Sequence, residues 1–160
     1  MGAKRLLPMN NNKLLNKLLG ISNLRVTRSE FSSEEQLILF VESNLPVASC
    51  PDCGHISDRV HDVSEVHLIR DLPIAERRCY LSYQARRFKC EHCEKTFVER
   101  VNWKRPHFSY TERYECYVYQ KVRRESVSQV AQDEGLSEEA VQAIFEHRAK
   151  KRLRHAATHK

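Results

Sequence analysis

Two Cys-x-x-Cys pairs constrain this chain more than any other feature of its sequence. Cys50 and Cys53 form the first pair and Cys90 and Cys93 the second, with 36 residues between the pairs. Two thiolates at this spacing reach one ion, and two such pairs complete a closed tetrahedral site. The pattern therefore predicts a single structural zinc ion, Zn2+, bound by the four cysteines. A small β-rich segment has a thin core, so the ion would supply much of its folding energy.

A disulfide, a redox pair and an iron site are the competing interpretations. The sequence shows no secretory signal, and its longest apolar run, Leu37–Val41, is too short to cross a membrane. We therefore expect a cytoplasmic protein, and disulfides are rare in that reducing compartment. Iron also accepts four tetrahedral sulfurs and stays open as an alternative. Cys79 and Cys116 are expected to be small core residues, and His55 and His92 to lie at the surface or to support the site.

Basic residues are concentrated around the second cysteine pair and at the end of the chain. The net charge is +6; residues 75–108 carry 9 basic and 4 acidic groups, and the last fourteen residues carry six basic groups and no acidic one. Such clusters attract phosphates, although a solvated surface is the alternative. We expect the basic side chains beside the second pair to contact DNA phosphates, because the nearby Glu91, Glu94 and Glu99 would not neutralise them. These side chains are Arg86, Arg87, Lys89 and Arg100.

Residues 127–146 have the pattern of a helix-turn-helix. Ser126 and Ser137 suit the N-caps of two helices, and Gly135 suits a tight turn with a positive φ. The small Ala131 leaves room for the second helix, and apolar side chains fill the angle between the two helices. These apolar side chains are Val127, Val130, Leu136, Val141 and Ile144. A plain helical hairpin that packs on a partner protein is the alternative.

The helix that begins at Ser137 is expected to enter a DNA groove. Gln142 is the candidate for a contact with a base edge, and Ser137 for a contact at the start of the helix. Arg148, Lys151 and Arg152 lie further along the helix and suit phosphates. The two glutamates that follow Ser137 complement the positive end of the helix, although they would also face phosphates.

Hydrophobic periodicity predicts the remaining elements. A leucine stripe predicts a short helix over residues 13–19. Apolar runs predict two strands, Leu24–Phe31 and Leu37–Glu42, and the second is expected to be central because it is apolar on both faces. A period of two over residues 81–85 predicts a further strand that ends in a bulge at residues 86–87.

Together these elements predict an α+β fold, in which a small zinc-stapled β-rich module is followed by a three-helix helix-turn-helix unit. The helical unit is expected to begin with a capping box at Ser109 and to end near Arg152. The expected parts are residues 1–22, a short N-terminal helix and lead-in; residues 23–106, the β-rich zinc-binding domain; and residues 107–160, the DNA-binding domain with a basic C-terminal tail.

Several short motifs follow one another in a specific order. They are Cys50-Pro51-x-Cys53-Gly54, Val60-His61-Asp62, Arg70-Asp71-Leu72-Pro73, Arg86-Arg87-Phe88-x-Cys90, Thr96-Phe97-x-Glu99-Arg100, Arg105-Pro106-His107, Ser126-Val127-Ser128-x-Val130-Ala131 and Glu134-Gly135-Leu136-Ser137. In this order the chain resembles the N-terminal region of ISL-three family insertion-sequence transposases. The resemblance implies a zinc-binding domain and a helix-turn-helix that recognise transposon ends. In that family a catalytic domain follows, with an acidic triad in a ribonuclease-H-like fold.

The fourteen residues after Glu146 are too few for such a catalytic domain, so we expect no enzymatic activity. The expected function is sequence-specific binding of double-stranded DNA at transposon ends, by a truncated or stand-alone binding region that represses or assists transposition. A second copy of the chain and a catalytic transposase chain are further candidate partners, and the bacterial nucleoid is the expected location. A transcription regulator, and a zinc-dependent module that binds protein or RNA, are the alternatives.

Overall fold

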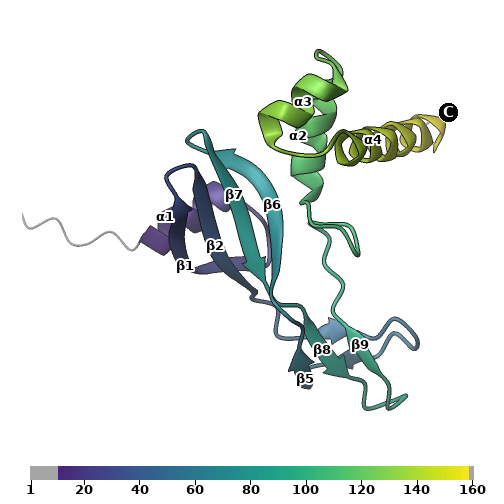
Figure 1. Ribbon diagram of the computed structural model, residues 1–160. Helices are drawn as coiled ribbons and strands as arrows, with labels where there is room; N and C mark the ends of the chain where they lie inside the picture. The colour runs from purple at the N-terminus through teal and green to yellow at the C-terminus, as the bar shows by residue number, and fades with distance from the viewer. Residues whose placement is uncertain (1–10, 159–160) are drawn as a thin grey trace, which may run out of the picture. The chain divides into compact units, whose positions relative to one another are not determined.

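The computed structural model describes residues 11–158 (Figure 1). The chain divides into two compact units, Met1–Asn102 and Trp103–Lys160, and the described part is mixed α+β, as predicted. Its helices are α1 (Asn11–Leu19), α2 (Glu112–Val122), α3 (Val127–Glu134) and α4 (Glu138–Thr158). Its strands are β1 (Leu24–Ser33), β2 (Gln36–Ser43), β3 (Ala48–Ser49), β4 (Ile56–Ser57), β5 (Val60–Val63), β6 (His67–Ile74), β7 (Arg77–Tyr83), β8 (Arg86–Lys89) and β9 (Thr96–Val98). No helix within residues 11–158 is long and apolar enough to cross a membrane.

The largest sheet has four strands in the order β1-β2-β7-β6. β1 with β2 and β6 with β7 are antiparallel hairpins, and the parallel pairing of β2 with β7 joins them. The predicted strands Leu24–Phe31 and Leu37–Glu42 are confirmed as β1 and β2, and β2 is central as expected. Its parallel partner, β7, was not predictable from local pattern, because parallel pairing depends on residues far apart in the chain.

The core of this sheet lies on the face that α1 covers. The leucine stripe predicted over residues 13–19 is confirmed as α1, and Leu19 at its end is fully buried. Asn16 accepts a hydrogen bond from the backbone N–H of Val26 at 2.7 Å, which fixes the helix to β1. Cys79 and Leu81 are both fully buried on β7, so Cys79 is a core residue as predicted.

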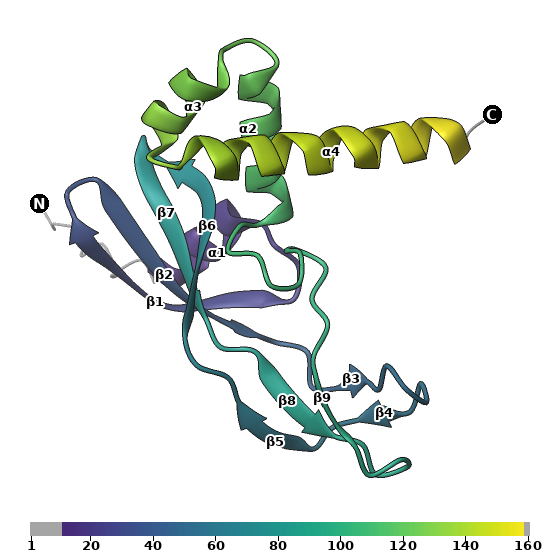
Figure 2. The same cartoon turned by 45° about the vertical axis from the view of Figure 1, so that its right-hand side comes forward.

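The zinc-binding part of the first unit is built from two separate stretches of chain. β3 pairs with β4, and β5, β8 and β9 form a three-stranded sheet, as seen in the lower half of Figure 2. The strand predicted over residues 81–85 ends earlier, at Tyr83, and residues 86–89 form β8 in the other sheet. The predicted bulge is therefore a change of sheet. Ser64 fixes the backbone where the chain passes from one sheet to the other. Its hydroxyl accepts from the Ala85 N–H at 2.9 Å, and its own N–H donates to the Ala85 carbonyl at 2.8 Å.

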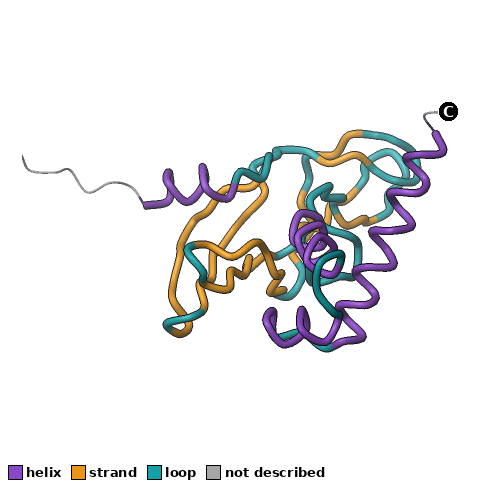
Figure 3. Tube along the Cα trace, turned by 90° about the horizontal axis from the view of Figure 1, so that it is seen from above, coloured by secondary structure: helices purple, strands orange, loops and turns teal. Residues whose placement is uncertain are grey.

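The second unit contains α2, α3 and α4 around a common apolar core. Tyr114 and Val118 of α2 pack there with Val130 of α3 and with Val141 and Ile144 of α4. Figure 3 shows α4 along its whole length; it runs to Thr158, beyond the expected end near Arg152.

One predicted cap in this unit is wrong and another is confirmed. α2 is capped by Thr111 and not by Ser109, because the Thr111 side chain accepts from the Tyr114 N–H at 3.2 Å. Ser126 caps α3 as predicted.

Candidate metal centre and nucleic-acid interface

Each cysteine pair lies in a tight loop at the end of a β-hairpin. The Cys50 N–H donates to the carbonyl of His55 at 2.8 Å, and the Cys90 N–H donates to the carbonyl of Lys95 at the same distance. The residue after the second cysteine of each pair has a left-handed backbone, with φ 74° at Gly54 and 59° at Glu94. The two loops are thus alike, and each turns both of its sulfurs inward.

The four sulfurs converge on one point. All lie within 4.8 Å of one another, with Cys50 and Cys93 at 3.8 Å and Cys53 and Cys90 at 3.5 Å. A tetrahedral zinc ion with Zn–S bonds of about 2.3 Å separates its sulfurs by roughly 3.8 Å. The predicted ligands therefore fit one zinc ion. Four protein sulfurs leave no open coordination position, which is the arrangement of a structural site.

The protonation of these thiols is set by backbone amides and by the thiols themselves. Backbone N–H groups of Cys93 and His92 lower the pKa of Cys90 to about 7. The amide of His55 also lowers that of Cys53, but burial and the neighbouring thiols raise its pKa to about 12. One thiolate next to another is unfavourable, so all four sulfurs ionise together only around a cation.

A small apolar cluster supports the site from one side. Phe88 of β8 and Phe97 of β9 are stacked with ring centroids 5.9 Å apart and pack against Cys50 and Cys90.

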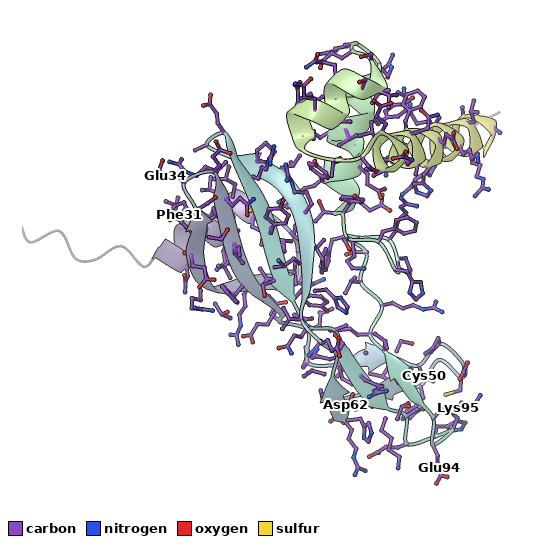
Figure 4. The ribbon with its side chains drawn as sticks, viewed as in Figure 1. Phe31, Glu34, Cys50, Asp62, Glu94 and Lys95 are labelled. Atoms are coloured by element: carbon purple, nitrogen blue, oxygen red, sulfur yellow. The ribbon has the colours of Figure 1, made fainter. Side chains whose placement is uncertain are left out.

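The two loops also contact each other beside the sulfurs. Asp52 of the first loop pairs with Lys95 of the second at 3.2 Å, and Cys50 and Lys95 lie at the same end of this part of the chain (Figure 4). His55 and His92 are exposed and stack on each other with centroids 5.7 Å apart. They support the site from outside the ligand set.

The basic side chains expected to bind phosphates beside the second pair differ in their surroundings. Arg86 is bound to Glu99, with Nη2 2.6 Å from Oε2. Arg87 donates from Nε to Asp62 at 2.7 Å across the β5–β8 pair. The expectation that Glu91, Glu94 and Glu99 would leave these side chains unneutralised is therefore wrong for Arg86, which pairs with Glu99. Arg87 pairs with a carboxylate outside that set, Asp62. Lys89 is half-buried and Arg100 is exposed.

The turn between α3 and α4 has the expected geometry. Gly135 caps α3 with φ 66° and ψ 39°, the left-handed conformation that was predicted for it. The N–H of Leu136 then bonds the carbonyl of Ala131 at 2.9 Å, and Ser137 accepts from the Ala140 N–H at 3.1 Å to begin α4. Ala131 is buried at the core of the unit, where a larger side chain would push the helices apart.

A buried carboxylate, that of Glu134, joins α2 to α3, and the sequence analysis did not predict this contact. Glu134, at the end of α3, accepts from the hydroxyls of Tyr114 and Tyr117 at 2.9 Å and 3.0 Å and from Lys121 at 3.1 Å. Burial opposes the charged form, but these hydrogen bonds lower the pKa of Glu134 below its usual value. The spacing of Tyr114, Tyr117 and Lys121, which share one face of α2, could have indicated a buried polar partner.

The predicted DNA-binding residues of α4 and of its N-cap, Ser137, fall into two groups. Ser137 and Gln142 are exposed, and Gln142 donates to Glu146 at 2.9 Å. The three cations further along contact α2: Arg148 and Lys151 bond Glu112 at 2.5 Å and 2.8 Å, and the Arg152 guanidinium lies over the Tyr119 ring at 5.7 Å.

The remaining unpredicted feature is the environment of Cys116. It is half-buried and contacts the Arg148 guanidinium, so the expected core role holds only in part.

Comparisons with known proteins agree with this arrangement. Residues 46–93 match the family described as the zinc-finger of transposase IS204/IS1001/IS1096/IS1165, and residues 99–149 match the helix-turn-helix domain of transposase family ISL3. The chain is also 33% identical over 93 residues to the transposase for insertion sequence element IS1001 of Bordetella parapertussis. That alignment covers 57% of this chain and 23% of the relative. No solved structure matches. The four converging sulfurs and the capped α3–α4 turn therefore lie in two segments that each resemble a domain of ISL3-family transposases, in the order zinc finger and then helix-turn-helix.

Proposed function

We propose that this chain recognises the ends of a transposon as a sequence-specific binder of double-stranded DNA. The observation that carries the proposal is the α3–α4 pair, closed by left-handed Gly135 within the segment that matches a transposase helix-turn-helix. In such a unit the second helix enters the major groove and its first turns face base edges. Here those turns expose Ser137 and Gln142, and a glutamine amide pairs well with adenine.

The zinc ion would hold the first unit in shape and would not act on DNA. Four cysteines would ligate it, so it offers neither an open position nor a bound water. We assign DNA phosphate contacts in this unit to Lys89 and Arg100, and secondarily to Arg86 and Arg87, because the two last are already paired with carboxylates.

Binding without cleavage is the activity we assign to these residues. A chain of this kind occupies transposon ends, and it either represses transposition or positions the ends for a catalytic domain. That domain would be supplied within a longer protein, by a second copy of this chain in such a protein, or by a separate transposase chain. These partners form part of the proposal; the relative named above is a transposase of which the alignment covers 23%.

Selection of bound fragments from fragmented genomic DNA tests the proposal. The zinc-loaded chain should enrich fragments that contain the inverted repeats flanking an insertion sequence, and its affinity should fall steeply with salt. Enrichment of promoter fragments without such repeats would favour a transcription regulator. Absence of salt-dependent DNA binding would favour a protein- or RNA-binding module, and either result would overturn the proposed function.

A further inference from the structure

A cationic cleft of about 480 Å³ lies within the second unit, along the C-terminal half of α4. It is separate from the residues that the proposed function uses to read bases. Six nitrogen-bearing side chains and one carboxylate, Glu112, line it. The six are Arg105, His147, Lys150, Lys151, Arg154 and His155.

We propose that this cleft holds a backbone phosphate of the same DNA whose bases the first turns of α4 contact. The inference rests on the proposed function and deepens it, since it joins the phosphate contact that the sequence predicts for Lys151 to Lys150 and Arg154, which lie beyond the family match that ends at residue 149. Its chemistry is charge complementarity between a cationic cleft and a phosphodiester.

The acidic groups near the cleft are already engaged. Glu112 bonds both Arg148 and Lys151, and these contacts outweigh burial and lower its pKa. Arg105 is held by the buried Glu115 at 2.7 Å, and its guanidinium stacks on Phe108 at 3.6 Å. Arg105 is therefore a fixed cation in the wall of the cleft.

Cations outnumber carboxylates among the described residues in and beside the cleft. Two carboxylates, Glu112 and Glu115, face five cations, the four of the lining and Arg148. Among these seven described residues the balance is therefore positive by three charges. The pKa of His147 is lowered by burial and by the positive charge of the neighbouring Arg105. A bound phosphate would complement this excess.

Charge is also divided along α4 itself. Residues 138–146 contain three glutamates and no cation, whereas residues 147–158 contain five arginines and lysines and no carboxylate. The lining residues of α4 recur at spacings of three and four, so they share one helical face. Arg148 and Arg152 lie toward α2, where they contact Cys116 and Tyr119.

α4 is too long for all of its residues to contact bases within one groove. Its 21 residues span about 31 Å at 1.5 Å per residue, whereas the major groove is about 12 Å wide. Lys150 and Arg154 follow Gln142 by eight and twelve residues, which is about 12 and 18 Å along the axis. At 3.6 residues per turn these two residues are also rotated by about 80° and 120° around the axis from Gln142, toward the wall of the groove. If Gln142 contacts a base edge, Lys150 and Arg154 therefore lie where the helix leaves the groove, beside the phosphates.

Neutralising the exposed side of the cleft tests the proposal. The variant Lys150→Gln with Arg154→Gln removes two charges from exposed positions, so zinc content and helical circular dichroism should be unchanged. Lys13→Gln with Lys17→Gln removes two exposed charges from α1 and is the matched control. The readout is affinity for selected and random duplex DNA at several salt concentrations.

We expect the cleft variant to bind both DNAs more weakly by the same factor. Its plot of log affinity against log salt should be shallower by about 0.9 for each lost phosphate contact, and the control should match the wild type. A methylphosphonate scan of the DNA should then find a linkage whose neutralisation weakens the wild type but not the cleft variant.

Three results would overturn the proposal. A cleft variant with wild-type slope, in a chain that binds DNA, excludes the cleft and leaves the proposed function standing. Tighter, equally cleft-dependent binding of duplex RNA would assign the cleft to another nucleic acid. A wild-type chain without salt-dependent DNA binding would remove both the cleft and the proposed function.

Discussion

The guanidinium of Arg86 lies against the carboxylate of Glu99, with Nη2 2.6 Å and Nε 3.1 Å from the same oxygen. The other carboxylate oxygen accepts from the Tyr83 hydroxyl at 2.5 Å. Arg86 also donates to Ser43 and to the carbonyl of Leu45, just after β2. This pair therefore joins the large sheet to the zinc-binding strands. Arg86, although it lies near the cysteines, has a structural role.

Replacing Arg86 should therefore destabilise the fold before it affects DNA. The Glu99 side chain is only 4% exposed, and an unpaired buried carboxylate costs about 3–5 kcal/mol. Arg86→Ala should lower the free energy of unfolding in urea by that amount, whereas Arg100→Ala, at an exposed position, should leave it unchanged and weaken DNA binding. An Arg86→Ala chain with wild-type stability would instead support a direct phosphate contact.

Removing the metal should unfold the zinc-binding strands. Purified protein should contain one colourless zinc per chain by elemental analysis, and chelation should remove structure from β3, β4, β5, β8 and β9, because metal binding and folding are coupled there. Cys50→Ser and Cys93→Ser should be equally damaging. Cys79→Ser, in the core of the other sheet, should cost only about 1–2 kcal/mol. Iron in the preparation, or a folded chain without metal, contradicts the zinc assignment.

Glu134 should stabilise the second unit in a pH-dependent way. Its folded pKa lies below the ordinary value of 4.5, so its contribution is fully present above about pH 4.5 and is lost as pH falls through the folded pKa. Glu134→Gln should weaken hydrogen-exchange protection in α2 and α3 by about 1–3 kcal/mol at pH 7, and by less at pH 3.5. Glu125→Gln, on an exposed turn, is the control. A difference that grows on acidification would contradict this assignment.

The turn between β6 and β7 should be open to improvement. Ala75 and Glu76 both have left-handed backbones, with φ 48° and 64°, and this pair of positions favours Asn-Gly in a two-residue hairpin. Ala75→Asn with Glu76→Gly should raise the free energy of unfolding by about 1–2 kcal/mol, because the strain is relieved. Glu65→Gly, in a loop without a positive φ, should slightly lower it. Denaturant unfolding of the zinc-loaded chains measures both.

Gln142 should affect specificity and not general affinity. Gln142→Ala should cost about 1–3 kcal/mol on the selected DNA site and little on random DNA, measured by fluorescence anisotropy. Gln120→Ala, on the exposed side of α2, should change neither. If the ratio of the two affinities stays the same while the fold is intact, α4 does not read bases, and specificity must come from the zinc-binding strands.

The metal ligands and the helix-turn-helix were predictable because local spacing determines their geometry. Two cysteines with two residues between them reach one ion wherever their loop lies in the fold. Gly135 meets the steric requirement of a left-handed cap, and the apolar periodicity around it determines which faces of α3 and α4 are buried. Each cysteine pair, and the turn at Gly135, depends on residues within a few positions of one another, so the sequence by itself determined these features.

Only the tertiary structure decided which charges remain available to a ligand. Arg86, Arg87 and Arg148 meet carboxylates that lie 13, 25 and 36 residues away in the chain. These meetings depend on strand register and on which helix faces pack together. The parallel β2–β7 pairing has the same origin, and neighbouring residues carry no signal of it. A sequence records how many charges a segment has, but ion pairing is a property of distances in the folded chain.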